Sequence, residues 1–317
     1  MSKNSSRLQR LSHFIPSGLG LLLFGASVWA LQNELQQYSF GEVLRSLVAI
    51  PSSLLGLAIA LTVINYWVFT GYDTLAVRYI HHPLAYRKTA LVAIVSIAIS
   101  NSIGLSLLSG SAIRYRFYTA WGLSGIEITQ IVAFCNLGFW LGLFAVGGIV
   151  FLVAPIAIPT LLHLPFNSAQ PLGWIFLAAV VGYLLWHLFS RNALQIGRFV
   201  IPRLPVSLAV AQVSIAALDW ILAAAVLYAL LPAAVSQSYT GFFSIYLLGQ
   251  VAGVISNVPG GLGVFETVVF LLLSPLVPSA TVFGALIAYR GIYYLGPLFI
   301  AVILLGLHEL KQRWQRV

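Results

Sequence analysis

The stretch Ser256-Asn-Val-Pro-Gly-Gly-Leu-Gly-Val-Phe-Glu266 interrupts an apolar part of the chain that extends from Phe242 to Leu273. Its proline removes a backbone donor and its three glycines lack side chains, so a helix must break here. Unpaired backbone groups cannot face hydrocarbon, and a break at membrane depth is tolerated only against protein or a water-filled cavity. Transporters build sites from such broken helices. The residues of the predicted cavity-lining break are Asn257, Pro259, Gly260, Gly261 and Gly263.

The composition places the chain in the membrane. Hydrophobic residues make up 60% and charged residues 7% of 317 residues, whereas soluble domains carry about 25% charged residues. Several apolar segments are long enough to cross a bilayer, which predicts an all-α polytopic membrane protein. The net charge of +9 comes from basic residues in short loops beside these segments. It indicates membrane orientation and anionic lipid rather than nucleic acid.

The positions of the basic residues predict the topology. Lys3, Arg7 and Arg10 precede the first apolar segment and place the N-terminus in the cytoplasm. The tail with Lys311, Arg313 and Arg316 is placed in the cytoplasm by the same rule, so the last crossing must run inward. The predicted crossings are residues 14–31, 48–72, 126–158, 174–190, 205–231 and 281–308.

Two remaining apolar segments are predicted to be re-entrant hairpins. Residues 90–108 contain Ser100 and Asn101, which are predicted to weaken the helix and line the cavity. A full crossing there would leave the following arginines outside, against the positive-inside rule. Residues 242–275 must start and end outside if the last crossing runs inward. The alternative is eight full crossings.

The two hairpins share a short pattern, a Ser-Asn pair followed by Gly104 or Gly260. They open from opposite faces, as two halves of an inverted-topology repeat would. We therefore expect one membrane-embedded domain over residues 1–317, with halves at about 1–158 and 174–310, and no soluble synthase domain.

Charged residues within the apolar segments are the candidate site. Arg290 lies deep in the last crossing, where a charge costs on the order of 3 kcal/mol. It either pairs with Asp219 or Glu266 or binds a lipid phosphate, and both can hold. Asp219 needs a cation or a polar cavity. Glu266 follows the break directly, where it can cap the next helix or attract a cationic group.

A second group of charges surrounds the first hairpin. Asp73, at the inner end of the second crossing, is either an interface anchor or an acidic partner for a cationic headgroup. Arg114 and Arg116 follow the hairpin among tyrosines. They either mark the depth of the lipid headgroups or bind a phosphate.

Other motifs have simpler explanations. Gly122-Leu-Ser-Gly125 resembles the nucleophile motif of intramembrane proteases, but Glu127 follows Ser124 by three residues and predicts a capping box. Gly138-x3-Gly142 and Gly249-x3-Gly253 predict close helix packing. No nucleotide-binding loop or metal motif is present in the sequence, so we expect no cofactor, no metal and no catalytic residue.

Three motifs resemble a known family: residues 257–266, Ser111-Ala-Ile-Arg-Tyr-Arg-Phe-Tyr118, and Tyr289-Arg-Gly-Ile-Tyr-Tyr-Leu-Gly-Pro297. They are similar to the N-terminal membrane domain of bacterial lysylphosphatidylglycerol synthase/flippases, the multiple peptide resistance factor family. The resemblance covers about residues 10–310. At the matching motif positions lie Asp73, Arg114, Glu266 and Arg290.

The resemblance implies a flippase of the bacterial plasma membrane. The substrate would be an anionic or aminoacylated phosphatidylglycerol, moved from the inner to the outer leaflet to repel cationic antimicrobial peptides. The chain stops at Val317, before the family's lysyltransferase domain, so we expect no enzyme activity. A separate synthase or a second copy are possible partners. A small-solute or ion transporter, an intramembrane lipid enzyme and a non-catalytic partner of a synthase remain alternatives.

Overall fold

The computed structural model describes residues 40–103, 106–156, 167–190, 194–196, 199–201, 204–232, 238–256 and 258–314. The predicted crossing at 14–31 and Asn257 lie outside the described residues. The described chain is helical, which confirms the predicted all-α class. A single small exception is the antiparallel pair β1 (Leu194–Ile196) and β2 (Phe199–Ile201), in the loop between two predicted crossings.

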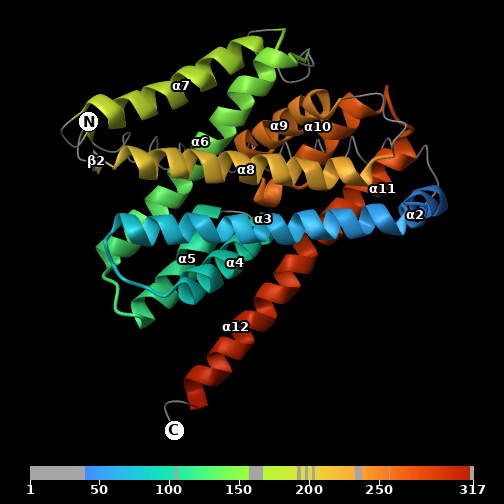
Figure 1. Cartoon of the computed structure of the whole chain (residues 1–317). Helices are drawn as coiled ribbons and strands as arrows, with labels where there is room; N and C mark the ends of the chain where they lie inside the picture. The colour runs from blue at the N-terminus through green and yellow to red at the C-terminus, as the bar shows by residue number, and fades with distance from the viewer. Residues whose placement is uncertain are drawn as a thin grey trace, which may run out of the picture.

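The helices are shown in Figure 1. In chain order they are α2 (Phe40–Val48), α3 (Ser52–Tyr79), α4 (Tyr86–Ile103), α5 (Ser106–Ala120), α6 (Gly125–Val153), α7 (Gln170–Phe189), α8 (Val206–Leu230), α9 (Tyr239–Ile255), the 3₁₀ turn η2 (Pro259–Gly261), α10 (Val264–Leu273), α11 (Ser279–Tyr289), the π-helical η3 (Arg290–Leu295) and α12 (Gly296–Trp314).

Helix starts follow from local sequence. Pro51, Pro205 and Pro278 each take the N-cap position in an extended backbone conformation, before α3, α8 and α11. Proline suits a helix start because its missing N–H needs no partner there. At α6 the predicted capping box is confirmed. The Ser124 hydroxyl accepts from the Glu127 amide, and the Glu127 carboxylate accepts from the Ser124 amide.

Five helical segments are long and apolar enough to cross a membrane: Ser52–Tyr79, Gly125–Val153, Gln170–Phe189, Val206–Leu230 and Ser279–His308. They coincide with the five predicted crossings that fall within the described residues. The last of them is not one α-helix, because η3 interrupts it. A π-helical turn inside an α-helix is uncommon and often marks a functional site.

Helices α3 and α8 run antiparallel through the centre of the molecule (Figure 1), with Asn65 opposite Asp219 and Gly71 opposite Ile215. Helix α6 packs on α8 through the predicted small-residue pattern. A Cβ built on Gly142 would lie 2.6 Å from the backbone of Ala216. Only glycine allows this approach, which confirms close packing of the pair.

Two pairs of helices form hairpins. In the first, Ser100 near the end of α4 contacts Ser109 near the start of α5, and Lys88 near the start of α4 lies over the ring of Trp121, just after the end of α5. In the second, Gly253 of α9 faces Gly261 of η2 and Gly249 faces Phe265 of α10. Within each pair, positions later in the first helix lie opposite positions earlier in the second, so both hairpins are antiparallel.

The buried apolar residues form two main clusters. One surrounds α9, α10 and α11, and the other surrounds α3, α4 and α5. Large apolar side chains also cover the outside of the bundle, such as Trp67, Trp174 and Phe299, each more than 60% exposed. Such a surface is suited to contact with lipid rather than water.

Candidate functional site

The tips of the two hairpins meet, although they are about 150 residues apart in sequence. A Cβ built on Gly260 would lie 3.3 Å from the carbonyl oxygen of Asn101 and 3.6 Å from that of Ser102. The Ser102 hydroxyl also donates to the carbonyl of Tyr294 in η3 at 3.3 Å. The two hairpin tips and the π-helical segment therefore form one junction.

Glycines make the second tip possible. Gly260, Gly261 and Gly263 have φ of +63°, +61° and +79°, a left-handed region that side chains disfavour. The predicted break at Pro259–Gly263 is thus confirmed, and it leaves carbonyl groups of the tip without helical partners.

Arg290 holds this tip. Its Nε donates to Glu266 Oε1, and both Nη atoms donate to the carbonyl oxygen of Gly260 at 3.2 Å. The guanidinium lies 4.4 Å from the ring centroid of Tyr294, close enough for a cation–π interaction. Of the two pairings considered for Arg290, the structure has Glu266. The side chain remains 17% exposed.

Glu266 has two roles at once. Oε2 accepts from the backbone amide of Gly263 at 2.8 Å, at the start of α10, while Oε1 accepts from Arg290. Helix capping and charge pairing were separate interpretations of this residue, and the structure combines them. The carboxylate couples the start of α10 to η3.

Asp73 and Arg114 form a second buried ion pair. Arg114 Nε donates to Oδ1 at 2.9 Å and Nη2 donates to Oδ2 at 2.7 Å. The Tyr118 hydroxyl donates to Oδ1 at 2.8 Å. Asp73 is 0% and Arg114 6% exposed. Asp73 thus lies in the protein interior. Arg116, two residues further along α5, is exposed.

Small residues let α5 approach α4 at this pair. A Cβ on Gly110 would lie 2.4 Å from the hydroxyl of Ser100 and 3.4 Å from Nη1 of Arg114. Ser100 is buried and accepts from the hydroxyl of Ser109 at 3.5 Å. Ser100 and Asn101 lie in the last turn of α4, so the helix does not break at these two residues.

Asp219 has a different environment. Its Oδ1 accepts from Asn65 Nδ2 at 3.0 Å and its Oδ2 accepts from the Tyr72 hydroxyl at 3.0 Å. Asn65 Oδ1 in turn accepts from the hydroxyl of Tyr293, in η3. Among the residues that the structure describes, the hydrogen-bond partners of Asp219 are neutral, and Asp219 does not pair with Arg290.

Sequence reasoning missed several of these partners. Asn65 and Tyr72 belong to no motif, and each lies in an apolar helix where one polar residue is unremarkable. Tyr293 lies within the Tyr289–Pro297 motif, but the motif alone gives it no partner. Asn65 could have been found from its position within a predicted crossing, since a polar amide there needs hydrogen-bond partners. The π-helix leaves no mark in the sequence beyond the Tyr289–Pro297 motif.

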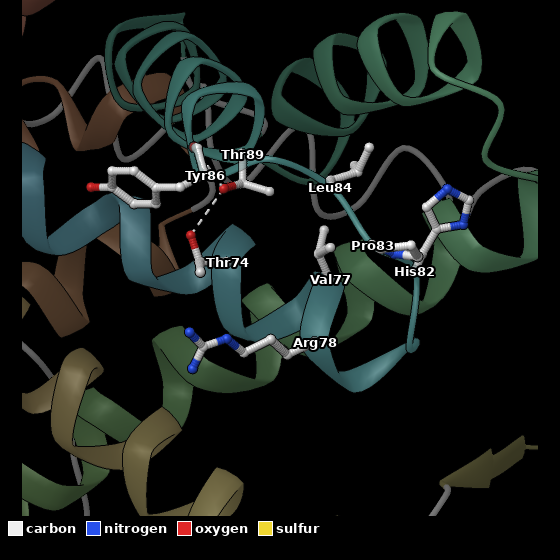
Figure 2. Close-up of a pocket in the computed structure, with 8 residues that line it drawn as sticks. All are labelled: Thr74, Val77, Arg78, His82, Pro83, Leu84, Tyr86 and Thr89. Atoms are coloured by element: carbon white, nitrogen blue, oxygen red, sulfur yellow. Dashed lines mark hydrogen bonds between the residues drawn. The ribbon is translucent and has the colours of Figure 1, made fainter.

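A separate pocket of about 320 Å³ lies where α3 connects to α4. Figure 2 shows the Thr74 and Thr89 hydroxyls facing each other across it, and they are 3.0 Å apart. Arg78 and His82 also line the pocket. None of its lining residues belongs to the hairpin tips, so we do not include it in the site. The described residues hold no group of three or more His, Cys, Asp or Glu side chains that could bind a metal.

Comparison with known proteins identifies relatives of this membrane region. The family model described as "Lysylphosphatidylglycerol synthase TM region" matches residues 18–301. An uncharacterized protein of Synechocystis sp. is 51% identical over 304 residues, which are 96% of this chain and 94% of the relative. The inner membrane protein YbhN of Escherichia coli is 31% identical over 252 residues, 78% of this chain and 77% of YbhN.

A more distant relative is much longer. The phosphatidylglycerol lysyltransferase of Staphylococcus haemolyticus is 23% identical over 317 residues, and this alignment covers 93% of the chain but 34% of the lysyltransferase. The similarity therefore concerns the transmembrane region of such proteins.

Proposed function

The chain belongs to the lysylphosphatidylglycerol synthase transmembrane-region family and is a multi-pass membrane protein, and from this premise we propose that it moves a phospholipid across the membrane. The substrate we propose is an aminoacylated phosphatidylglycerol, in the first place lysylphosphatidylglycerol, carried from the inner to the outer leaflet. There the cationic lipid would lower the negative surface charge and repel cationic antimicrobial peptides. The protein itself would not be an enzyme.

The observation that carries the proposal is the junction of the two hairpin tips at Arg290. A guanidinium with several donors suits a phosphate as well as a carboxylate. In the structure its donors go to Glu266 and to the carbonyl of Gly260. A lipid phosphate would compete with these two acceptors, and the tip of the second hairpin would then be released.

The proposed topology has six full crossings and two re-entrant hairpins. In support, α9 and α10 are apolar but only 17 and 10 residues long, whereas a crossing needs about 20 residues. The antiparallel arrangement within each hairpin would return the chain to the face from which it entered. With α3 and α8 antiparallel, the two halves would form an inverted repeat with the site between them.

The other charges of the site would act on the headgroup in turn. Arg114 and Arg116 would attract the phosphate from the cytoplasmic side, and Arg114 would keep its pairing with Asp73 in the resting state. Glu266 would attract the cationic aminoacyl group near the centre. Both termini would lie in the cytoplasm, and a separate synthase or a second copy would be a partner.

A lipid translocation assay tests the proposal. Purified protein is placed in phosphatidylcholine vesicles that contain tail-labelled lysylphosphatidylglycerol, and label in the outer leaflet is quenched chemically. Vesicles with the wild-type protein should lose nearly all label, and protein-free vesicles only the outer half. Arg290→Ala should slow translocation by roughly tenfold or more, because a hydrogen bond to a charged group contributes about 1.5–3 kcal/mol.

Two further variants make the result decisive. Arg290→Lys keeps the charge but not the planar fork of donors, so it should fall between wild type and Arg290→Ala. Arg45→Gln removes an exposed arginine of α2 and should leave the rate unchanged. Wild-type rates in a stably folded Arg290→Ala protein would contradict the role of Arg290. No translocation by the wild-type protein would contradict the function.

A further inference from the structure

Asp219 differs from the other buried carboxylates of the molecule. Asp73 pairs with Arg114, and Glu266 pairs with Arg290. Asp219 is just as deeply placed, with 5% exposure in the middle of α8, and yet its hydrogen-bond donors are the amide of Asn65 and the hydroxyl of Tyr72. A carboxylate without a cation is costly at this depth unless its charge can be removed.

The local geometry accepts Asp219 with or without a proton. Facing a carboxylate, the Tyr72 hydroxyl donates its proton to Oδ2 across 3.0 Å. Facing a carboxylic acid, the same hydroxyl can rotate and accept, because a phenol is both donor and acceptor. Asn65 stays in place in either case, since its Nδ2 also contacts the backbone carbonyl of Asp219 and its Oδ1 accepts from Tyr293.

The titratable and charged groups that face Asp219 come from several of the elements packed around it. Tyr66, Tyr246 and Tyr293 lie close enough to interact with its charge, and phenols keep their proton at neutral pH. The neighbouring elements carry four further titratable groups. Cys135 on α6 lies beside Tyr72, and Tyr289 on α11 is hydrogen-bonded to Tyr246. On α7, Tyr183 is hydrogen-bonded to Gln212, and His187 to the backbone amide of Leu204. The charged residues Asp73, Arg114, Glu266 and Arg290 pair among themselves.

A proton fits this site better than a metal cation. Hard cations such as Ca²⁺ and Mg²⁺ take six or more oxygen ligands. Here one carboxylate is available, and the amide oxygen of Asn65 is already occupied by Tyr293. A proton needs only one oxygen of Asp219.

The geometry points to Asp219 as a proton-binding site that couples lipid movement to a proton gradient. The inference rests on the proposed transport function. The coupling path consists of two hydrogen bonds: the Tyr293 hydroxyl donates to Asn65 Oδ1, and Asn65 Nδ2 donates to Asp219 Oδ1. Tyr293 lies three residues from Arg290 in the same π-helical segment, so a change of charge at Asp219 is felt where the hairpin tip is held.

Vesicles with a pH difference across the membrane test the coupling. With the wild-type protein, the pH gradient should make labelled lysylphosphatidylglycerol accumulate in one leaflet, and dissipating the gradient should abolish the accumulation. Asp219→Asn, which imitates the protonated form, should equilibrate the lipid with no response to the gradient. Asp219→Glu keeps a titratable group and should retain a response if Asp219→Asn fails to fold.

The outcomes separate this inference from the function on which it rests. Translocation that is equally fast with and without a pH gradient would overturn proton coupling but leave the flippase function standing. Accumulation driven by a sodium gradient at equal pH would overturn the assignment to a proton. A wild-type protein that moves no lipid would overturn the proposed function itself.

Infrared difference spectroscopy decides the protonation without transport. When the pH of the purified protein is changed, a carboxylic acid carbonyl band should appear or disappear, and this band should be absent in Asp219→Asn. Asp73→Asn should retain it, because the band belongs to Asp219. A wild-type protein without such a band at any pH would overturn the inference.

Discussion

The ion pair between Asp73 and Arg114 allows a quantitative test of the core of the first hairpin. Replacing Arg114 by glutamine removes two donors, at 2.9 and 2.7 Å, from a carboxylate that is 0% exposed. Of the donors to Asp73 that the structure describes, the Tyr118 hydroxyl then remains. Breaking a buried pair in this way costs about 3–5 kcal/mol of folding free energy, because a charge is left without its partner.

The cost has an upper bound and a characteristic non-additivity. A carboxylate that has lost its partner can become protonated, which keeps the loss of folding free energy far below the cost of burying an isolated charge. Asp73→Asn should lower the folding free energy by a similar amount because it leaves Arg114 without its charged partner. The double variant Asp73→Asn, Arg114→Gln removes both charges and leaves no unpaired charge buried, so it should cost no more folding free energy than either single change. The expected coupling energy is therefore about 3 kcal/mol or more.

The measurement is reversible unfolding in lipid–detergent micelles, followed by tryptophan fluorescence. Arg87→Gln, at an exposed position on the same hairpin, is the matched control and should change stability by less than about 0.5 kcal/mol. Additive effects of the two single changes would refute the reasoning, since they would mean that Asp73 and Arg114 do not interact in the folded protein.

Two further changes test helix packing and capping by the same unfolding measurement. Gly142→Ala places a methyl group 2.6 Å from the backbone of Ala216 and should lower the free energy of unfolding by about 1–3 kcal/mol. The control Gly182→Ala, whose new Cβ meets no neighbouring atom within 4 Å, should be neutral or stabilising. Equal effects would contradict the close α6–α8 contact. Ser124→Ala removes the acceptor of the Glu127 amide and should cost about 0.5–2 kcal/mol, and an unchanged stability would show that the capping box contributes nothing.

Much of the architecture could be predicted from local chemistry. Pro259 and the glycines after it fix a break because no other residues adopt that backbone freely. Ser124 and Glu127 fix a helix start for a similarly local reason. The long apolar segments locate the crossings, because a helix in lipid must satisfy its backbone internally and reach across the bilayer.

Partner choice could not be predicted in the same way. Whether Arg290 pairs with Glu266 or Asp219 depends on how α8, α10 and η3 pack in three dimensions, which no spacing in the sequence encodes. Asn65 and Tyr293 were missed for that reason, because each is significant only through its partner on another helix. Likewise, α2 lies in a stretch predicted to be a loop, and its helix is supported by packing on α11.

The two ion pairs also bear on how the protein responds to voltage. A charge moved through the full membrane potential gains about 2.3 kcal/mol per 100 mV. Asp73 with Arg114, and Glu266 with Arg290, each sum to zero, so a hairpin that moves together with its partner carries almost no net charge through the electric field. In the proposed transport cycle, voltage would then act through what is bound and released, the lipid headgroup and the proton at Asp219.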